Sequence, residues 1–309
     1  MITSTNLHLS KITTFTGQAG AIYTLIDGRR KGTFISGSGD GQVVEWALDR
    51  PDEGALMAKV NTNIFTLLPL TGWQHLLIGQ LQGGIHMIDL KDHSEKKHLV
   101  FHQKGVFDLE LIDNGSKLLA VGGDGVLSAW DTDTFELIKS FKISEKGLRA
   151  IALHPNKPEM AVASSDGNIY LLSTKDFSLL YTMEHHKNSV FSLDFSENGN
   201  KLYAGSRDAF LSVWNAEAGY ELSESIGAHM YTLNSVRLSP DGRLLATASR
   251  DKTVRLWNTQ NNELVKVINL EKEEAHTNSV NALLWLDNET LLTAGDDRTI
   301  NAWKIEVKF

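Results

Sequence analysis

Seven copies of one four-strand pattern predict an all-β fold, a β-propeller with seven blades. The clearest copy is Arg243–Asn258, which holds two apolar runs of strand length, Leu244–Ala248 and Val254–Trp257, around a polar turn. Val236–Leu238 precedes this unit and Glu263–Ile268 follows it. Together these runs make four antiparallel strands in about forty residues, and one such sheet cannot bury both of its faces alone.

The pattern recurs at a nearly constant period. The residue that follows the acidic turn position marks each copy, and it occurs at Gly41, Gly83, Gly125, Gly167, Ala209, Lys252 and Arg298. The steps are 42 residues four times, then 43, then 46. A period in the low forties with four strands in each period is typical of propeller blades.

Aromatic–polar pairs close the third strand of several copies. They are Trp130-Asp131, Trp214-Asn215, Trp257-Asn258 and, more loosely, Trp46-Ala47 and Trp303-Lys304. With these pairs at this spacing, the chain resembles the WD-repeat family over nearly its whole length. The resemblance implies a rigid, non-enzymatic platform. Such a platform binds a protein or peptide on the top face, which carries the turn Asp residues and the loops into the inner strands.

Size and composition narrow the class of protein. The repeats fill the 309 residues, so we expect a single domain over residues 1–309. The absence of cysteine excludes disulfides and favours a cytoplasmic protein. A net charge of −8 argues against nucleic acid as a partner. No signal peptide is visible, and no apolar run approaches the ~20 residues that span a membrane. We expect a monomeric propeller within a larger complex.

The two ends of the chain predict how the ring closes. The first inner strand begins near Ile22, and Leu9–Phe15 before it aligns with outer strands such as Leu137–Phe141. The last repeat stops after its third strand, Thr299–Ile305. We therefore expect residues 1–15 to supply the outer strand of blade seven, as in the family, which would remove an unpaired sheet edge.

The remaining elements follow the period. The expected inner, second and third strands of blades two to five are Ile64–Leu68, Leu76–Gly79, Ile85–Leu90, Val106–Leu111, Leu118–Val121, Val126–Asp131, Leu148–His154, Glu159–Ala163, Ile169–Ser173, Val190–Ser196, Lys201–Gly205 and Phe210–Asn215. Blade one continues through Thr33–Ser36 and Val43–Leu48 into an acidic link, Asp49–Gly54. Blade seven adds Val280–Leu286 and Thr290–Ala294 after the long loop Leu270–Thr277, where the charge run Glu271–Glu274 predicts a solvated loop.

The resemblance also implies a polar tie in each blade. This tie joins a His before the inner strand, a Ser or Thr on the second strand, the turn Asp and the Trp. It is complete in blade six (His229, Thr247, Asp251, Trp257) and in blade seven (His276, Thr293, Asp297, Trp303). The partial sets are His186, Asp208 and Trp214 with Ala204 at the hydroxyl position in blade five; His102, Asp124 and Trp130 in blade three; Ser36, Asp40 and Trp46 with Gln18 for His in blade one; and Asp166 alone in blade four. Blade two has Val60, Ile78, Gln82 and Ile88 at these positions.

Other readings of these residues are less favoured. A His–Ser/Thr–Asp set could be a nucleophilic triad, but it recurs in neighbouring blades with its hydroxyl inside a strand. Eleven histidines invite a metal site, yet none lie at helical ligand spacing. Gly122–Gly125 could cradle a phosphate, but no helix follows it. We therefore expect no catalytic residue, metal or cofactor.

The inner strands carry a further signal. Their buried positions read apolar-x-x-apolar, as in Ile22/Leu25, whereas a flat strand has a period of two. A bulge between the two apolar residues reconciles the spacing, and bulges often re-aim side chains beside functional sites. The predicted bulge residues are Tyr23, Phe65, Phe107, Arg149, Phe191, Asn234 and Asn281.

We expect these bulge residues to form an arc around the channel mouth and, with Arg207 and Arg250 on the same face, to bind the partner. Two aspects of this hypothesis remain open. The aromatic residues could instead pack between blades. The ring could also be an enzyme with a central-channel site, or a scaffold subunit of a larger assembly.

Overall fold

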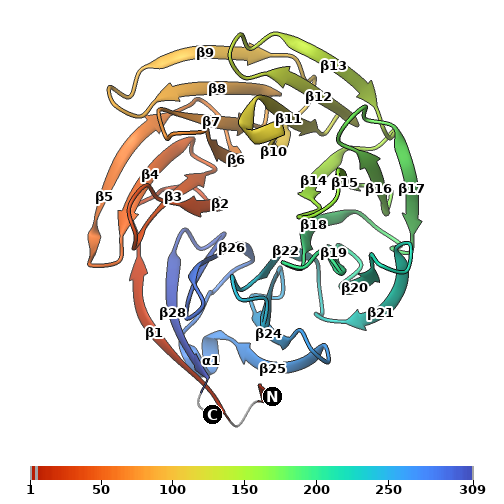
Figure 1. Ribbon diagram of the computed structural model, residues 1–309. Helices are drawn as coiled ribbons and strands as arrows, with labels where there is room; N and C mark the ends of the chain where they lie inside the picture. Colours follow the sequence, from red (N-terminus) through yellow and green to blue (C-terminus); the bar gives the residue numbers. More distant parts are fainter. Residues whose placement is uncertain (1, 4–5, 308–309) are drawn as a thin grey trace.

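The computed structural model describes residues 2–3 and 6–307, which form seven four-stranded antiparallel sheets arranged in a ring (Figure 1). The predicted all-β, seven-bladed propeller is therefore confirmed. The helix α1 (Leu270–Glu273) is four residues long. Within the described ranges no helix is long and apolar enough to cross a membrane.

Each of blades one to six consists of four strands in sequence order, from the centre outward. Blades one to three contain β2 (Ile22–Asp27), β3 (Thr33–Ser38), β4 (Gln42–Ala47), β5 (Arg50–Lys59); β6 (Ile64–Pro69), β7 (His75–Gln80), β8 (Gly84–Asp89), β9 (Glu95–Val100); β10 (Val106–Ile112), β11 (Lys117–Gly122), β12 (Val126–Asp131) and β13 (Leu137–Lys142). Blades four to six contain β14 (Leu148–Leu153), β15 (Glu159–Ser164), β16 (Asn168–Ser173), β17 (Leu179–Glu184); β18 (Val190–Phe195), β19 (Lys201–Ser206), β20 (Phe210–Asn215), β21 (Glu221–Gly227); β22 (Leu233–Leu238), β23 (Leu244–Ser249), β24 (Val254–Asn258) and β25 (Glu263–Ile268).

Blade seven is assembled from both ends of the described chain. It contains β26 (Val280–Asp287), β27 (Thr290–Gly295), β28 (Ile300–Val307) and, as its outer strand, β1 (Leu7–Phe15). Figure 1 shows the red β1 running beside the blue β28, and Leu7 pairs with Val307. The predicted ring closure is confirmed. Residues 1 and 4–5 of the predicted closing segment, and residues 308–309 of the predicted domain, lie outside the described residues.

The hydrophobic core lies between neighbouring blades. In the cluster between blades six and seven, Leu256 of β24 and Val265 of β25 pack with Leu283 of β26 and Leu291 of β27. Alternate residues of each strand face opposite neighbours, so every sheet contributes to two such layers. At the closure, Phe15 of β1 is only 1% exposed. Its ring lies 4.9 Å from Phe34 of blade one, so β1 also contributes to the layer between blades seven and one.

The tight turn between the second and third strands has the same backbone in every blade. The residue after the turn position has a left-handed φ in all seven copies, from 65° at Arg298 to 96° at Gly167. Glycine is needed in blade one because a Cβ on Gly41 would meet the carbonyl oxygen of Val60 at 1.9 Å. The turn therefore fixes the loop that enters the next blade.

Two expected segments differ from the prediction. The expected link Asp49–Gly54 is mostly strand, because a two-residue turn after Ala47 brings Arg50 opposite it and β5 begins there. Charged residues and Pro51 are tolerated in β5 because it is the outermost strand of its sheet. The expected solvated loop Glu271–Glu274 instead begins as α1, whose Lys272 backbone N–H donates to the Asn269 side chain.

Candidate functional site

Each inner strand carries a bulge near its beginning, directly after its first residue. The strand register shifts between Ile22 and Thr24 in β2, between Ile64 and Thr66 in β6, and at the matching place in the other five blades. The skipped residues are Tyr23, Phe65, Phe107, Arg149, Phe191, Asn234 and Asn281, so the predicted bulges are confirmed. Each extra residue is turned away from the layers between blades.

The seven bulge residues line one cavity of about 130 Å³ at the centre of the ring. Five of them form a continuous stack, which we call the mouth arc: Tyr23, Phe65, Phe107, Arg149 and Phe191. Ring centroids lie 5.3 Å apart for Tyr23 and Phe65, and 5.0 Å apart for Phe65 and Phe107. The Arg149 guanidinium lies 4.2 Å from the Phe107 ring and 5.2 Å from the Phe191 ring.

The mouth arc is half-buried and belongs to none of the hydrophobic clusters between blades. Burial, and then the nearby Arg207, lower the pKa of Arg149 below its ordinary value. The Arg149 side chain donates to Ser165 at 2.7 Å, which holds the guanidinium between its two aromatic neighbours. The arc is therefore a pre-ordered aromatic surface with one cation inside it.

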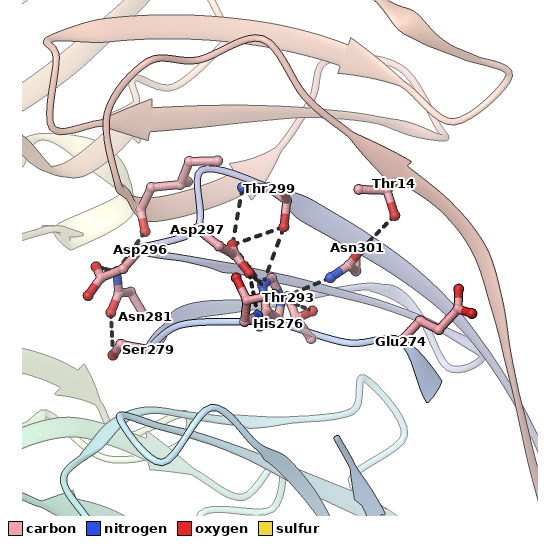
Figure 2. Close-up of polar contacts among 12 residues, drawn as sticks. Thr14, Glu274, His276, Ser279, Asn281, Thr293, Asp296, Asp297, Thr299 and Asn301 are labelled. Atoms are coloured by element: carbon pink, nitrogen blue, oxygen red, sulfur yellow. Dashed lines mark hydrogen bonds and ion pairs between the residues drawn. The ribbon is translucent and has the colours of Figure 1, made fainter. Parts of the chain in front are cut away.

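The other side of the channel mouth is polar and internally satisfied. Asn234 donates to the Val280 carbonyl at 2.8 Å, and Asn281 donates to Asp296 at 2.7 Å. Figure 2 shows Asn281 together with Ser279 and Asp296. These two amides link blades six, seven and one across the mouth, because Asn281 also donates to the Ile22 carbonyl.

Basic side chains surround the aromatic part of the mouth. Arg207 and Arg250 are exposed, each directly before its turn Asp. Lys104 lies beside Phe107, since a Cβ on Gly123 would contact both of them. In the described part of the chain, no ion pair is formed by Arg149, Arg207, Arg250, Lys104, Lys146 or Lys187. A chain with net charge −8 thus carries cations without ion pairs among the described residues on the face that also carries the turn carboxylates.

The polar ties of blades six and seven hold the loops that lead into this face. In blade six, His229 Nδ1 lies 2.9 Å from Asp251, His229 Nε2 lies 2.9 Å from Thr247, and Trp257 donates to Thr247 at 2.9 Å. Blade seven has the same set, with His276 between Asp297 and Thr293 (Figure 2). Trp303 donates to Thr293 at 3.0 Å.

The closing strand joins the blade-seven tie. Thr14 of β1 donates to Asn301 at 2.7 Å, and the Asn301 amide lies 3.3 Å from His276 Nε2 (Figure 2). The sequence comparison between repeats did not predict this extension, because Thr14 is 287 residues away from Asn301 along the chain.

Blades three and five correct the prediction that their hydroxyl is missing. In blade five, Ser212 on the third strand lies 2.8 Å from His186 Nε2 and accepts from Trp214 at 2.8 Å. Ser128 does the same for His102 and Trp130 in blade three. Ser212 is directly opposite Ala204 across the strand pair, so either position can place an oxygen at the same point.

The other three blades differ from this scheme. In blade one, Gln18 replaces His: its amide donates to Ser38 at 2.8 Å, and its oxygen accepts from Ser36 at 2.7 Å. In blade four, Asp166 accepts from Ser144 at 2.5 Å and from Tyr170 at 2.8 Å, so that blade has a shorter tie that the sequence analysis missed. The corresponding positions of blade two are occupied by buried apolar residues, Val60, Ile78 and Ile88, and by Gln82.

The turn carboxylates Asp166, Asp208, Asp251 and Asp297 have pKa values lowered by the hydrogen bonds that they accept. Burial alone would raise the pKa of Asp208, but hydrogen bonds from His186, Lys187 N–H and Phe210 N–H lower it to about 2. Asp251 behaves in the same way, with a pKa well below its usual range because His229, Thr253 and Met230 N–H donate to it. The pKa of His229 is lowered, chiefly by burial. The arrangement therefore favours a neutral His229 imidazole, which orients its loop rather than transferring protons.

Sequence reasoning missed a cluster of carboxylates in the central channel. Asp108, Glu110 and Asp194 lie with Arg237 around a cavity of about 370 Å³. Burial raises the pKa of all three carboxyl groups, and in Glu110 the neighbouring Asp108 raises it further. Asp108 accepts from the backbone N–H of Ile151 at 2.8 Å, and Asp194 accepts from Leu238 N–H at 2.7 Å. These two carboxylates therefore fasten inner strands of adjacent blades.

Comparisons with known proteins agree with this architecture. The family model described as "WD domain, G-beta repeat" matches residues 177–215, 221–258 and 267–304, which run from the outer strand of blade four to the third strand of blade seven. Chicken (Gallus gallus) WD repeat-containing protein 1 is 26% identical over 288 residues, which cover 89% of this chain and 44% of that protein. Rat (Rattus norvegicus) Transducin beta-like protein 3 is 33% identical over 117 residues, covering 37% of this chain and 14% of that protein.

A third relative is the Schizosaccharomyces pombe U3 small nucleolar RNA-associated protein 21 homolog, 27% identical over 149 residues, covering 47% of this chain and 16% of that protein. The chain thus spans less than half the length of these relatives. A closed ring of seven four-stranded blades defines a seven-bladed β-propeller. The chain carries WD repeats and is similar to WD-repeat proteins, as the resemblance predicted.

Proposed function

We propose that the protein is a non-enzymatic interaction platform whose top face binds an acidic peptide or an acidic segment of a partner protein. The observation that carries this proposal is the mouth arc, a half-exposed row of four aromatic rings and Arg149 in contact with one another. Beside it lie cations for which the described residues show no ion pair. Aromatic residues with arginine are typical of binding hot spots.

The charge distribution favours an acidic partner. Arg149 and the exposed Arg207 repel one another electrostatically, and a carboxylate or phosphate between them would relieve that repulsion. Apolar or aromatic side chains of the same segment would cover Phe65, Phe107 and Phe191. A basic partner would gain no charge complementarity here.

The hydrogen bonds that two of the channel carboxylates accept support a non-enzymatic role. Asp108 and Asp194 already accept backbone hydrogen bonds from the next blade, which favours a structural part for both. The hydroxyls of the polar ties are buried between a His and a Trp, where a substrate would not reach them.

Comparative affinity purification tests the proposal. Wild-type protein, Phe107→Ala, Arg149→Ala and a control, Tyr181→Ala, would be used to capture partners from the cells that express the protein, with quantification by mass spectrometry. Tyr181 is 49% exposed and lies on β17, the outer strand of blade four. We expect some partners to be retained by Tyr181→Ala and lost from both Phe107→Ala and Arg149→Ala. The melting temperatures of these variants should equal that of the wild type. Partners retained by all variants would favour the scaffold hypothesis instead.

A further inference from the structure

Blade two, which has no polar tie, carries a different polar cluster near its outer edge. His86 of β8 occupies the third-strand position that Ser128 and Ser212 hold in blades three and five, and it is directly opposite His98 of β9. The two imidazole rings are stacked, with centroids 4.1 Å apart and planes within 8°. Glu95 of β9 lies beside them, with an oxygen 2.7 Å from His86 Nδ1.

We propose that His86, Glu95 and His98 bind a divalent transition-metal ion, of which Zn²⁺ is the best match. One ligand atom from each residue lies within 4.8 Å of the others. Two imidazole nitrogens and one carboxylate oxygen form a ligand set that zinc uses in proteins, with water completing a tetrahedron. The ion would cross-link β9 to β8 in a blade whose four tie positions are Val60, Ile78, Gln82 and Ile88.

The geometry requires only local adjustment. Adjacent ligand atoms of a tetrahedral zinc site lie about 3.4 Å apart, so the His86–Glu95 contact of 2.7 Å must open by about 0.7 Å. His98 must also turn out of the stack, because the lone pairs of parallel rings do not converge. The His98 side chain is exposed, and its χ2 torsion is broad and readily adjusted.

Sequence reasoning could not find the site, because the two histidines are twelve residues apart and only the β8–β9 pairing brings them together.

Calorimetric titration of the chelator-treated full chain with Zn²⁺ tests the site. We expect one ion per chain, and a melting temperature that rises with added Zn²⁺ because the ion binds the folded state. His98→Gln and Glu95→Gln change exposed side chains, so both variants should fold, and each should weaken binding about tenfold or more. His93→Asn is the matched control, since His93 is exposed in the same blade, and Asn tolerates its left-handed φ of 59°.

Co²⁺ absorption provides an independent measurement, because the ligand-field bands report coordination by imidazole and carboxylate. The bands should form in wild type and His93→Asn and should be lost in His98→Gln. Absence of saturable binding in the wild type would overturn the proposal. Wild-type affinity in both His98→Gln and Glu95→Gln would overturn it as well.

Discussion

The buried hydroxyl of each polar tie can come from either of two opposing residues. Thr247 supplies it from the second strand in blade six, while Ser212 supplies it from the third strand in blade five. The resemblance implied His186, Asp208 and Trp214 as members of the tie, and Ser212 joins them there. The sequence could not predict Ser212, because the two positions belong to different strands and become equivalent only when those strands pair.

The first prediction concerns this exchange. Ser212→Ala should lower the free energy of unfolding by ~1–3 kcal/mol, because Trp214 Nε1 and His186 Nε2 lose their buried partner. Adding Ala204→Ser in the same chain should recover much of the loss, since residue 204 faces residue 212 and serine occupies that position in blade one. Urea denaturation of both variants measures the effect. A double variant no more stable than Ser212→Ala would contradict the equivalence of the two positions.

At the scale of the strand, periodicity predicted more than propensity did. The apolar-x-x-apolar spacing predicted a bulge at a named residue in each inner strand, and each register shift lies there. The same reasoning failed at Asp49–Gly54, because charge and proline are signals of a loop unless the strand is an outer one. An outer strand packs against few neighbours, so few of its residue types are restricted. Its sequence is therefore the least informative in the blade about secondary structure.

The second prediction concerns β1. Removing residues 1–11 would expose most of the edge of β28 while keeping Phe15 in its buried position. We expect a melting temperature lower by about 5 °C or more and self-association through the open edge. Thermal denaturation and light scattering measure these effects. A monomeric truncated protein with the parent melting temperature would show that β1 is dispensable for closure.

The third prediction concerns the rigidity of the blades. Blade two lacks a polar tie, whereas blades three, five, six and seven have one centred on a histidine. In metal-free buffer, amides of β7 and β8 should exchange faster than those of β19 and β20. Blade four should be intermediate, because Ser144 and Tyr170 hold Asp166. Hydrogen-exchange mass spectrometry measures the order, and equal protection of blades two and five would contradict it.

At the scale of the whole ring, the sequence predicted which residues occupy equivalent positions in the blades. It did not predict the cluster of charged side chains in the central channel. The equal spacing of Phe65 and Phe107 placed them in adjacent blades, and they stack at 5.0 Å. Glu110, Asp194 and Arg237 come from blades three, five and six and lie far apart along the chain, yet they line the same central cavity. Side chains that converge on an axis from non-adjacent blades leave no local pattern.

The fourth prediction follows from this convergence. The folded-state pKa of Glu110 is raised, chiefly by burial and then by Asp108, so its ionisation costs stability as pH rises. The cost is absent below the unfolded-state pKa of about 4.3 and complete above the folded-state value. Glu110→Gln should therefore stabilise the protein at pH 9 by on the order of 1 kcal/mol, after allowance for solvent screening, and have little effect at pH 4.

Urea midpoints at the two pH values measure this difference. Glu197→Gln is the control, because Glu197 lines the same cavity but is exposed. A Glu110→Gln effect that is equal at both pH values would show that the channel carboxylates do not interact as described.

The central claim is that the mouth arc binds acidic segments, and selection from a displayed random-peptide library against the immobilised protein tests it most directly. We predict enrichment of peptides that combine Asp or Glu with aromatic or aliphatic residues. Phe107→Ala should weaken a selected peptide by ~2 kcal/mol, about 30-fold, while Tyr181→Ala leaves its affinity unchanged. Selected peptides that bind Phe107→Ala and Arg149→Ala as tightly as wild type would contradict the claim.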